Sequence, residues 1–264
     1  MKIQIIVTTM HQEDFSILKR MKINTDVIIA NQANYNCFAT KQLPQGTALM
    51  ITTTTRGLSK NRNIGLEFVD RNTDYVLFAD DDLVFVENYL EKIVSELESH
   101  PEADAVKFNL TNLSKIRKIS MTPIMKWRKA SLLSVSSSGV WGMVIRMDSI
   151  IKYNLRFNEY FGAGTENYCG EDTIFLQEII KKGIKMYLSP LYIAGIDQSN
   201  STWFEGFNKK YFMVGGMVLS AIYPKIAYLI AFRSAYKFSR RENVKMKFLE
   251  IFKAYLMGIN KYKR

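Results

Sequence analysis

Apolar runs and segments of helical periodicity alternate along the first half of the chain. Runs of large apolar residues predict strands, and apolar residues that recur every three or four positions predict helices. The predicted strands are Lys2–Thr8, Asp26–Ala30, Ala48–Thr53, Tyr75–Ala79 and Ala105–Asn109. The predicted helices are Glu13–Met21, Ser59–Asp70 and Glu87–Ser99, the second with Ser59 as its N-cap. Strands that alternate with helices indicate an α/β fold with a mostly parallel sheet flanked by helices.

The middle of the chain has a weaker pattern. It predicts strands at Val140–Arg146 and Ile184–Leu188 and helices at Met147–Tyr153 and Glu171–Lys182. Gly183 follows the last of these helices and suits the left-handed conformation in which many helices end. The order of elements therefore predicts a nucleotide-binding layer of the Rossmann type that occupies the first half of the chain.

The C-terminal part changes character. Phe212–Phe232 is 21 residues long and contains one charged residue, Lys225, and one proline, Pro224. The length suits a membrane span, but a lysine and a proline near the centre argue against one. A pair of helices lying at a membrane face is expected instead, followed by an interfacial amphipathic helix within Lys237–Arg264. The alternative is a C-terminal helix packed on the body with an ordinary basic outer face.

The net charge of +11 is concentrated at one end of the chain. Residues 207–264 contain 13 lysines and arginines and two glutamates, so residues 1–206 are neutral overall. This contrast predicts a first domain at 1–206 and a basic, apolar helical tail at 207–264 that meets an anionic surface. The chain starts directly with a core strand, and Cys37 and Cys169 have no zinc-site spacing, so a reduced cytosolic setting is expected.

Three consecutive acids, Asp80-Asp81-Asp82, follow the predicted strand Tyr75–Ala79. Carboxylates at the C-terminal end of such a strand point into the crevice where open α/β sheets bind ligands. Adjacent acids repel one another, and a hard divalent cation that bridges carboxylates to substrate phosphates would relieve this repulsion. The alternative is a solvated acidic turn that caps the helix starting near Glu87.

Two helix starts carry further candidate chemistry. In Arg56–Asn63, Gly57 permits a close backbone approach, the first helical amides favour anions, and Arg62 offers a fork of donors. Glu171 and Asp172 begin a helix after a loop that contains Gly162-Ala163-Gly164, and an acid here suits a general base that deprotonates a hydroxyl. Basic decoration of a helix start and acids favoured by the helix dipole are the plainer alternatives.

In this order and spacing, these features resemble family 2 glycosyltransferases of the GT-A fold over about residues 2–205. The Gly-Leu-Ser-x-x-Arg-Asn sequence that starts at Gly57, followed by Asp80–Asp82 at this interval, is quite specific. The resemblance implies inverting transfer of a sugar from a nucleoside diphosphate donor to a hydroxyl, with Mg²⁺ or Mn²⁺ on the diphosphate.

The resemblance also implies a role for each acid. Asp80 and Asp81 are expected to bind the donor, and Asp82 is expected to bind the metal. Asp172, the second acid of the Glu-Asp pair, is expected to be the catalytic base, with Glu171 orienting the acceptor or the base.

The family's other donor contacts map onto the ends of the first two strands and onto the helix start. These positions are Thr8, Thr9, Asn31, Gln32, Gly57 and Arg62. The amides of Asn31 and Gln32 can present both donors and acceptors to a pyrimidine edge, although both are also common turn residues.

The chain departs from the family at a late position where many relatives have a metal-binding or diphosphate-binding histidine. Residues 196–203 contain none, and Asp197 either replaces that ligand or is an ordinary loop residue. His11 could reach the donor from the end of the first strand, but a surface position is expected. Trp141 and Trp203 could stack on acceptor sugars or belong to the core.

The sequence thus predicts a UDP-sugar-dependent glycosyltransferase that extends a glycan or lipid-linked glycan in polysaccharide biosynthesis, bound peripherally at the inner face of the cell membrane. The aromatic tail could also bury a homodimer surface. A metal-dependent nucleotidyltransferase and a nucleic-acid-binding protein are the alternatives. The apolar run of the tail disfavours nucleic acid, because an aqueous phosphate groove does not need such a surface.

Overall fold

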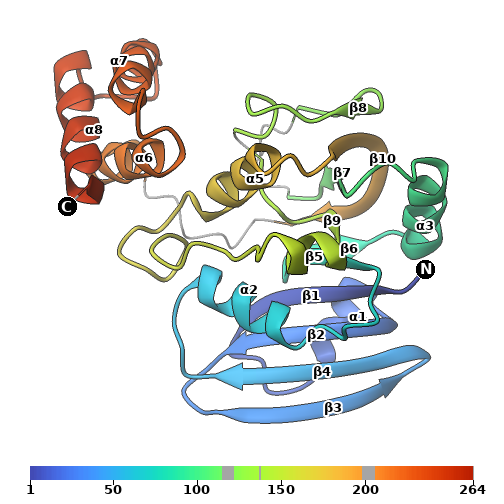
Figure 1. The fold of residues 1–264 in the computed structure, drawn as a ribbon. Coiled ribbons are helices and arrows are strands. Elements are labelled where there is room, and N and C mark those ends of the chain that lie inside the picture. Colours follow the sequence, from blue (N-terminus) through green and yellow to red (C-terminus); the bar gives the residue numbers. More distant parts are fainter. Residues whose placement is uncertain (115–121, 137, 198–205, 264) are drawn as a thin grey trace.

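A ten-stranded sheet crosses the molecule (Figure 1). The structure, a computed structural model, describes residues 1–114, 122–136, 138–197 and 206–263. The strands follow the order β3-β4-β2-β1-β5-β9-β7-β10-β6, and β8 pairs with β10. Their bounds are β1 Ile3–Met10, β2 Thr25–Gln32, β3 Cys37–Leu43, β4 Gln45–Thr53, β5 Tyr75–Asp80, β6 Leu83–Phe85, β7 Ala105–Asn112, β8 Arg128–Lys129, β9 Met143–Arg146 and β10 Met186–Ile196.

The strands β4, β2, β1 and β5 pair in parallel. Nearly all residues of β1, β2 and β5 are buried, as expected where helices cover both faces of a parallel sheet. In this register Thr8 of β1 lies between Ala30 of β2 and Asp80 of β5. The carboxyl ends of the three strands therefore meet at one edge of the sheet.

The remaining strands make the sheet mixed, although the predicted α/β architecture is confirmed. β9 runs antiparallel between β5 and β7, β6 runs antiparallel to β10, and β3 forms an antiparallel edge on β4. The sequence pattern did not predict β3 or β6. β3 lies almost wholly exposed at the sheet edge, so it lacks the apolar run by which the buried strands were recognised.

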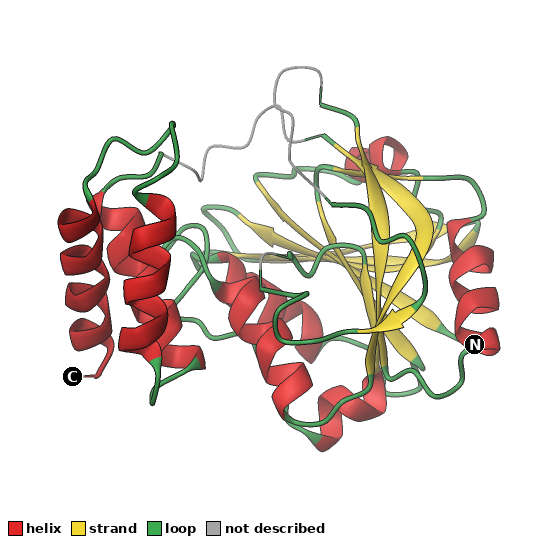
Figure 2. Cartoon of the chain, turned by 90° about the horizontal axis from the view of Figure 1, so that it is seen from above, coloured by secondary structure: helices red, strands yellow, loops and turns green. Residues whose placement is uncertain are grey.

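Helices cover both faces of the sheet (Figure 2). Residues of α1 (Ser16–Met21) and α3 (Tyr89–Ser99) pack in one core cluster. Residues of α2 (Leu58–Glu67), α4 (Met147–Lys152) and α5 (Glu171–Lys181) pack in the other. All five helices were predicted to within a few residues. The expected N-cap at Ser59 is wrong, because α2 starts one residue earlier, at Leu58, and its N-cap is Gly57.

Three C-terminal helices form a cluster with its own core (Figure 1). They are α6 (Lys209–Ile222), α7 (Ala227–Phe238) and α8 (Phe248–Lys263). The expected helix pair is confirmed, with Pro224 in the break between α6 and α7, and α8 supplies the expected amphipathic helix. In the part of the chain that is described, no helix has both the length and the apolar character needed to cross a bilayer.

Glycines allow α6 and α8 to cross closely. A Cβ atom added to Gly258 of α8 would overlap the carbonyl oxygen of Met213, and one added to Gly216 of α6 would overlap that of Tyr255. Both overlaps involve backbone, which cannot rotate away. The two helices therefore pack at a separation that only glycine permits at these positions.

We expect Gly258→Ala to destabilise the protein by about 1–3 kcal/mol, because the new methyl group must push two helices apart. The gain in helix propensity from the same change is about 1 kcal/mol and acts in the opposite direction. The free energy of unfolding in urea measures the balance, with Lys253→Ala at an exposed position of α8 as the control. A stabilised Gly258→Ala protein would contradict the close crossing.

Candidate functional site

Two threonines at the end of β1 hold the first two acids of the triplet. The Thr8 hydroxyl donates to Asp80 Oδ1 at 2.9 Å, and the Thr9 hydroxyl donates to Asp81 Oδ2 at 2.7 Å. Both threonines are buried. The parallel pairing of β1 with β5 creates these contacts, because it brings the two strand ends side by side. Thr8 and Thr9, expected to contact the donor, thus orient two acids expected to do the same.

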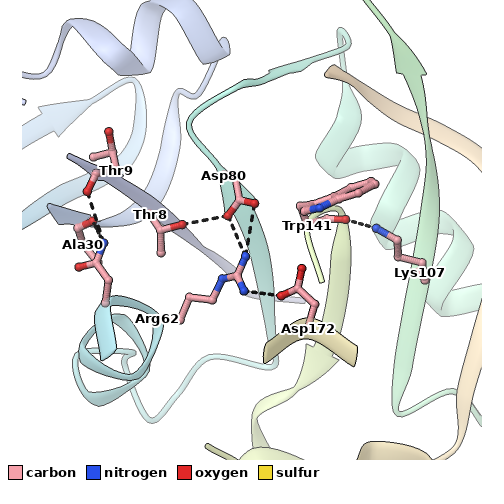
Figure 3. A network of polar contacts seen from close by, with 9 residues as sticks. Thr8, Thr9, Ala30, Arg62, Asp80, Lys107, Trp141 and Asp172 are labelled. Atoms are coloured by element: carbon pink, nitrogen blue, oxygen red, sulfur yellow. Dashed lines mark hydrogen bonds and ion pairs between the residues drawn. The ribbon is translucent and has the colours of Figure 1, made fainter. Parts of the chain in front are cut away.

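Arg62 connects an acid of the triplet to an acid of α5 (Figure 3). Its Nη2 donates to Asp80 at 3.0 Å, and its Nη1 forms an ion pair with Asp172. The side chain is buried, and its guanidinium lies 5.1 Å from the centre of the Phe157 ring. Arg62 was expected to contact the donor; both of its terminal nitrogens instead bind carboxylates of the protein. In this structure Arg62 therefore positions the two acids, and its expected contact with the donor stays a prediction.

Burial and the charge of the Arg62 guanidinium determine the pKa shifts of Arg62 and Asp172. Burial by itself would lower the pKa of Arg62, but Asp172 and Asp80 raise it above its ordinary value. Burial raises the pKa of Asp172, and Arg62 opposes that rise. The guanidinium therefore keeps an enclosed carboxyl closer to the ionised form that a general base requires.

Asp82 differs from its two neighbours because its Oδ1 atom is buried and has no hydrogen-bond partner among the described residues. Burial raises the pKa of Asp82 to about 8, and repulsion from Asp80, Asp81 and Asp197 contributes to the rise. Asp197 lies one residue beyond β10, opposite Asp82, and its backbone N–H donates to the Asp82 carbonyl at 3.0 Å. The structure thus brings together the two residues expected to bind a metal.

A divalent cation fits the chemistry of this corner. An unpaired, buried carboxylate oxygen with a second carboxylate residue nearby is the type of donor that Mg²⁺ and Mn²⁺ prefer. The described residues contain no group of three or more histidine, cysteine, aspartate or glutamate side chains that could hold a metal alone. Asp82 and Asp197 are therefore the residues that could hold a cation, with further ligands from outside the protein.

The loop before α5 covers the start of α2. The Ala163 carbonyl accepts from the Leu58 N–H at 2.9 Å, and the Phe161 carbonyl accepts from the Ser59 hydroxyl at 2.7 Å. The N–H of Gly57 donates to Gln32 Oε1 at 2.9 Å. The Gly57 amide is therefore bound within the protein in this structure, and the expected donor contact at Gly57 stays a prediction. Sequence inspection of α2 alone could not reveal that a distant loop occupies this helix start.

The polar groups of Asn31, expected to contact the donor base, are bound within the protein. Asn31 is fully buried, and its amide binds both backbone groups of Gln12 and the hydroxyl of Thr52, with distances of 2.9–3.0 Å. It therefore fixes the segment after β1, and its expected contact with a nucleotide base stays a prediction. Gln32 lies at the end of β2 and uses its oxygen to hold Gly57. His11 is exposed, as expected.

Glu171 lies at the first position of α5 and is buried. Its carboxyl carbon would lie 3.5 Å from a Cβ atom added to Gly162, so the loop closes directly over it. Burial raises the pKa of Glu171, and the neighbouring Asp172 adds to the rise. A carboxyl held in this way suits the expected orienting role better than a role as the ionised base.

Lys107 is a buried cation of this site that sequence inspection missed. It lies on β7, its ammonium group is 3.9 Å from the centre of the Trp141 ring, and it donates to the Trp141 carbonyl (Figure 3). Burial lowers the pKa of Lys107 to about 7, and Asp172 and Asp80 oppose that shift. The sequence indicates this buried lysine only by its position within the predicted strand Ala105–Asn109.

Lys107 restricts what Trp141 can do. The lysine occupies one face of the half-buried indole, so an acceptor sugar could stack only on the other face. Trp203, the second candidate for stacking, lies outside the described residues.

Comparisons with known proteins give a family and a fold. The model of glycosyl transferase family 2 matches residues 16–143. No curated protein sequence matches the chain.

Solved structures of S. aureus TarS share the fold. The structure of TarS 1–349 is 14% identical, with a TM-score of 0.59. Its complex with UDP-GlcNAc is 14% identical with a TM-score of 0.61, and its complex with UDP is 15% identical with a TM-score of 0.58. Each of these matches covers 99% of this chain and 72% of the TarS chain. At this level of identity the likeness shows the GT-A-like fold.

We expect Arg62→Met to destabilise the protein by about 3–5 kcal/mol, because it leaves two carboxylates enclosed without their cation. Lys60→Met, at an exposed position of the same helix, is the matched control. Urea unfolding measures both variants. Adding Asp172→Asn to Arg62→Met should recover part of the lost stability. An Arg62→Met protein as stable as the control would show that the Asp80–Arg62–Asp172 ion pairs do not stabilise the fold.

The raised pKa of Asp82 predicts how stability depends on pH. The folded chain keeps a proton on Asp82 up to about pH 8, whereas the unfolded chain releases it near the ordinary value of 3.8. The folded state therefore binds more protons in between, and its stability falls as the pH rises. In urea unfolding with EDTA, Asp82→Asn should flatten this decline between about pH 5 and about pH 8. The exposed Asp148→Asn variant should leave the decline unchanged.

Proposed function

Because this chain belongs to glycosyl transferase family 2, we propose that it transfers a sugar from a UDP-sugar to a hydroxyl group with inversion at the anomeric carbon. The observation that carries the proposal is the Asp80–Arg62–Asp172 bridge beside the Oδ1 atom of Asp82, which has no hydrogen-bond partner among the described residues. It provides an acid for the hydroxyl at one side and oxygen ligands for a cation at the other.

In this proposal Asp172 is the general base. Its carboxylate takes the proton of the acceptor hydroxyl as that oxygen attacks the anomeric carbon. The bond between the anomeric carbon and the phosphate oxygen breaks, and the nucleoside diphosphate leaves with the electron pair. Glu171 and Arg62 keep Asp172 in place during this step.

The donor lies, in this proposal, across the carboxyl ends of β1, β2 and β5. Asp80 ends β5 at this edge and Asp81 follows it, and Gln32 lies at the end of β2. The existence of a TarS structure with UDP-GlcNAc supports a UDP-sugar as the donor class. Trp141 is placed on the acceptor side.

We assign Asp82 and Asp197 to Mn²⁺ or Mg²⁺. The cation would supply positive charge to the leaving diphosphate. The two residues would hold the ion, and Thr9 fixes the orientation of the neighbouring Asp81. The acceptor is proposed to be a glycan or a lipid-linked glycan of a surface polysaccharide.

We expect Asp172→Asn to lower kcat by about 10²–10⁴-fold, the usual contribution of a general base. The amide oxygen can still accept from Arg62, so the fold should survive. Release of UDP from UDP-sugars in the presence of Mn²⁺ measures the effect. Glu178→Gln on the same helix, where the glutamate forms an i,i+4 ion pair with Lys182, is the control. A variant of Asp172 that retains normal turnover would exclude it as the base.

We also expect EDTA to stop UDP release and Mn²⁺ to restore it in the wild type. Asp82→Asn should respond to Mn²⁺ only at much higher concentrations, because it lacks the charged oxygen with no other partner. The product distinguishes this reaction from nucleotidyl transfer, which would release pyrophosphate. Detection of pyrophosphate in place of UDP would reject the proposed reaction.

A further inference from the structure

Helix α7 buries small residues and exposes large apolar ones. Ala227, Ala231 and Ala235 are fully buried against the other C-terminal helices. On the opposite side, 69% of Leu229 and 51% of Phe232 are exposed. A helix that packs only within a soluble protein turns its large apolar residues toward the core. The reversed arrangement indicates that the outer side of α7 contacts an apolar partner.

This surface continues onto α8. The Phe232 ring packs edge-on against the rings of Phe248 at 5.2 Å and Phe252 at 5.5 Å. Leu249 is 63% exposed next to them in the sequence. We call the resulting surface the α7–α8 face; it consists of Tyr228, Leu229, Phe232, Tyr236, Leu249 and Phe252.

Basic side chains surround the α7–α8 face. Arg240 donates to the Tyr236 hydroxyl at 3.0 Å, and the Lys263 ammonium lies 4.7 Å from the centre of the Tyr228 ring. Arg233, Lys237 and Lys253 are exposed on the same two helices. The last 58 residues carry a net charge of +11, so the apolar surface lies in a strongly positive field.

An anionic bilayer matches both properties. Apolar side chains enter the boundary between headgroups and acyl chains, and lysines and arginines remain at the level of the lipid phosphates. A second copy of this chain would bring two positive surfaces together, which opposes a symmetric dimer through this face. Aliphatic side chains such as Leu229 and Leu249 offer no stacking surface to nucleic-acid bases.

We propose that the α7–α8 face docks the protein on an anionic lipid bilayer without crossing it. Because α6 packs on α5, docking holds the start of α5, with Glu171 and Asp172, at a fixed place relative to the lipid surface. Two contacts show this packing. A Cβ atom added to Gly170 would overlap the side chain of Val218 in α6, and the Tyr223 hydroxyl donates to Gln177 of α5 at 2.8 Å. The presentation of a lipid-linked acceptor rests on the proposed function, whereas docking itself does not.

Co-sedimentation of the full chain with vesicles tests the docking. Vesicles of equimolar phosphatidylcholine and phosphatidylglycerol should bind the protein, and binding should weaken as the salt concentration rises. The double variant Leu229→Ser/Leu249→Ser should bind at least about tenfold more weakly, because two apolar anchors are lost. Leu133→Ser, which changes an 84% exposed leucine in the catalytic body, is the matched control and should bind normally.

Several outcomes would overturn the proposal. These are unchanged binding by the double variant, equal binding to vesicles of phosphatidylcholine alone, or a wild-type dimer that the double variant dissociates. Salt-sensitive retention of RNA on filters that is lost in the double variant would overturn it as well.

Release of UDP from a UDP-sugar in the absence of vesicles separates this proposal from the enzymatic one. Docking requires the double variant to keep that release while losing vesicle binding. If neither protein released UDP while the wild type alone bound vesicles, the proposed reaction would be rejected and the docking would stand.

Discussion

The candidate site depends on one buried cation shared by two carboxylates. Arg62 comes from α2, Asp80 from the end of β5 and Asp172 from α5, so the ion pairs form only when all three elements are in place. Enclosing such charges is costly unless each is paired, and the planar guanidinium can bind two carboxylates at once. The interaction that stabilises these buried charges therefore also places Asp172, the proposed base, beside the end of the central strands.

The C-terminal helices support this arrangement from outside the sheet. Gly170, with a φ of 106°, starts α5 in a conformation that favours glycine, and α6 packs against it closely enough to leave no room for a side chain. Lys181, on the last turn of α5, donates to the Ile222 carbonyl at the end of α6. The helix that carries Glu171 and Asp172 is thus held at both ends by the helical cluster. The distribution of charge suggested a separate tail, but the contacts between α6 and α5 join the helical cluster closely to the rest of the protein.

The sequence predicted best what is determined by local burial. The apolar run of β5 and the acids behind it were recognisable because a buried strand and its polar end have distinct compositions. The edge strand β3 was not, since its structure comes from pairing with β4. Asn31 and Gly57 were placed on a donor by resemblance, but long-range contacts with Gln12 and Gln32 decide where their polar groups point. Such contacts have no signature in neighbouring residues.

The three adjacent acids have the same side chain but different surroundings. Asp80 is neutralised by Arg62, and Asp81 is held by the Thr9 hydroxyl. Asp82 retains a buried oxygen without a partner among the described residues, with Asp197 adding a further negative charge nearby. Because the first two carboxylates are already bound, a cation entering this edge gains most at the third. The asymmetry arises from β1, α2 and β10, which lie outside the triplet in the chain, and it gives the proposed cation a preferred position at Asp82.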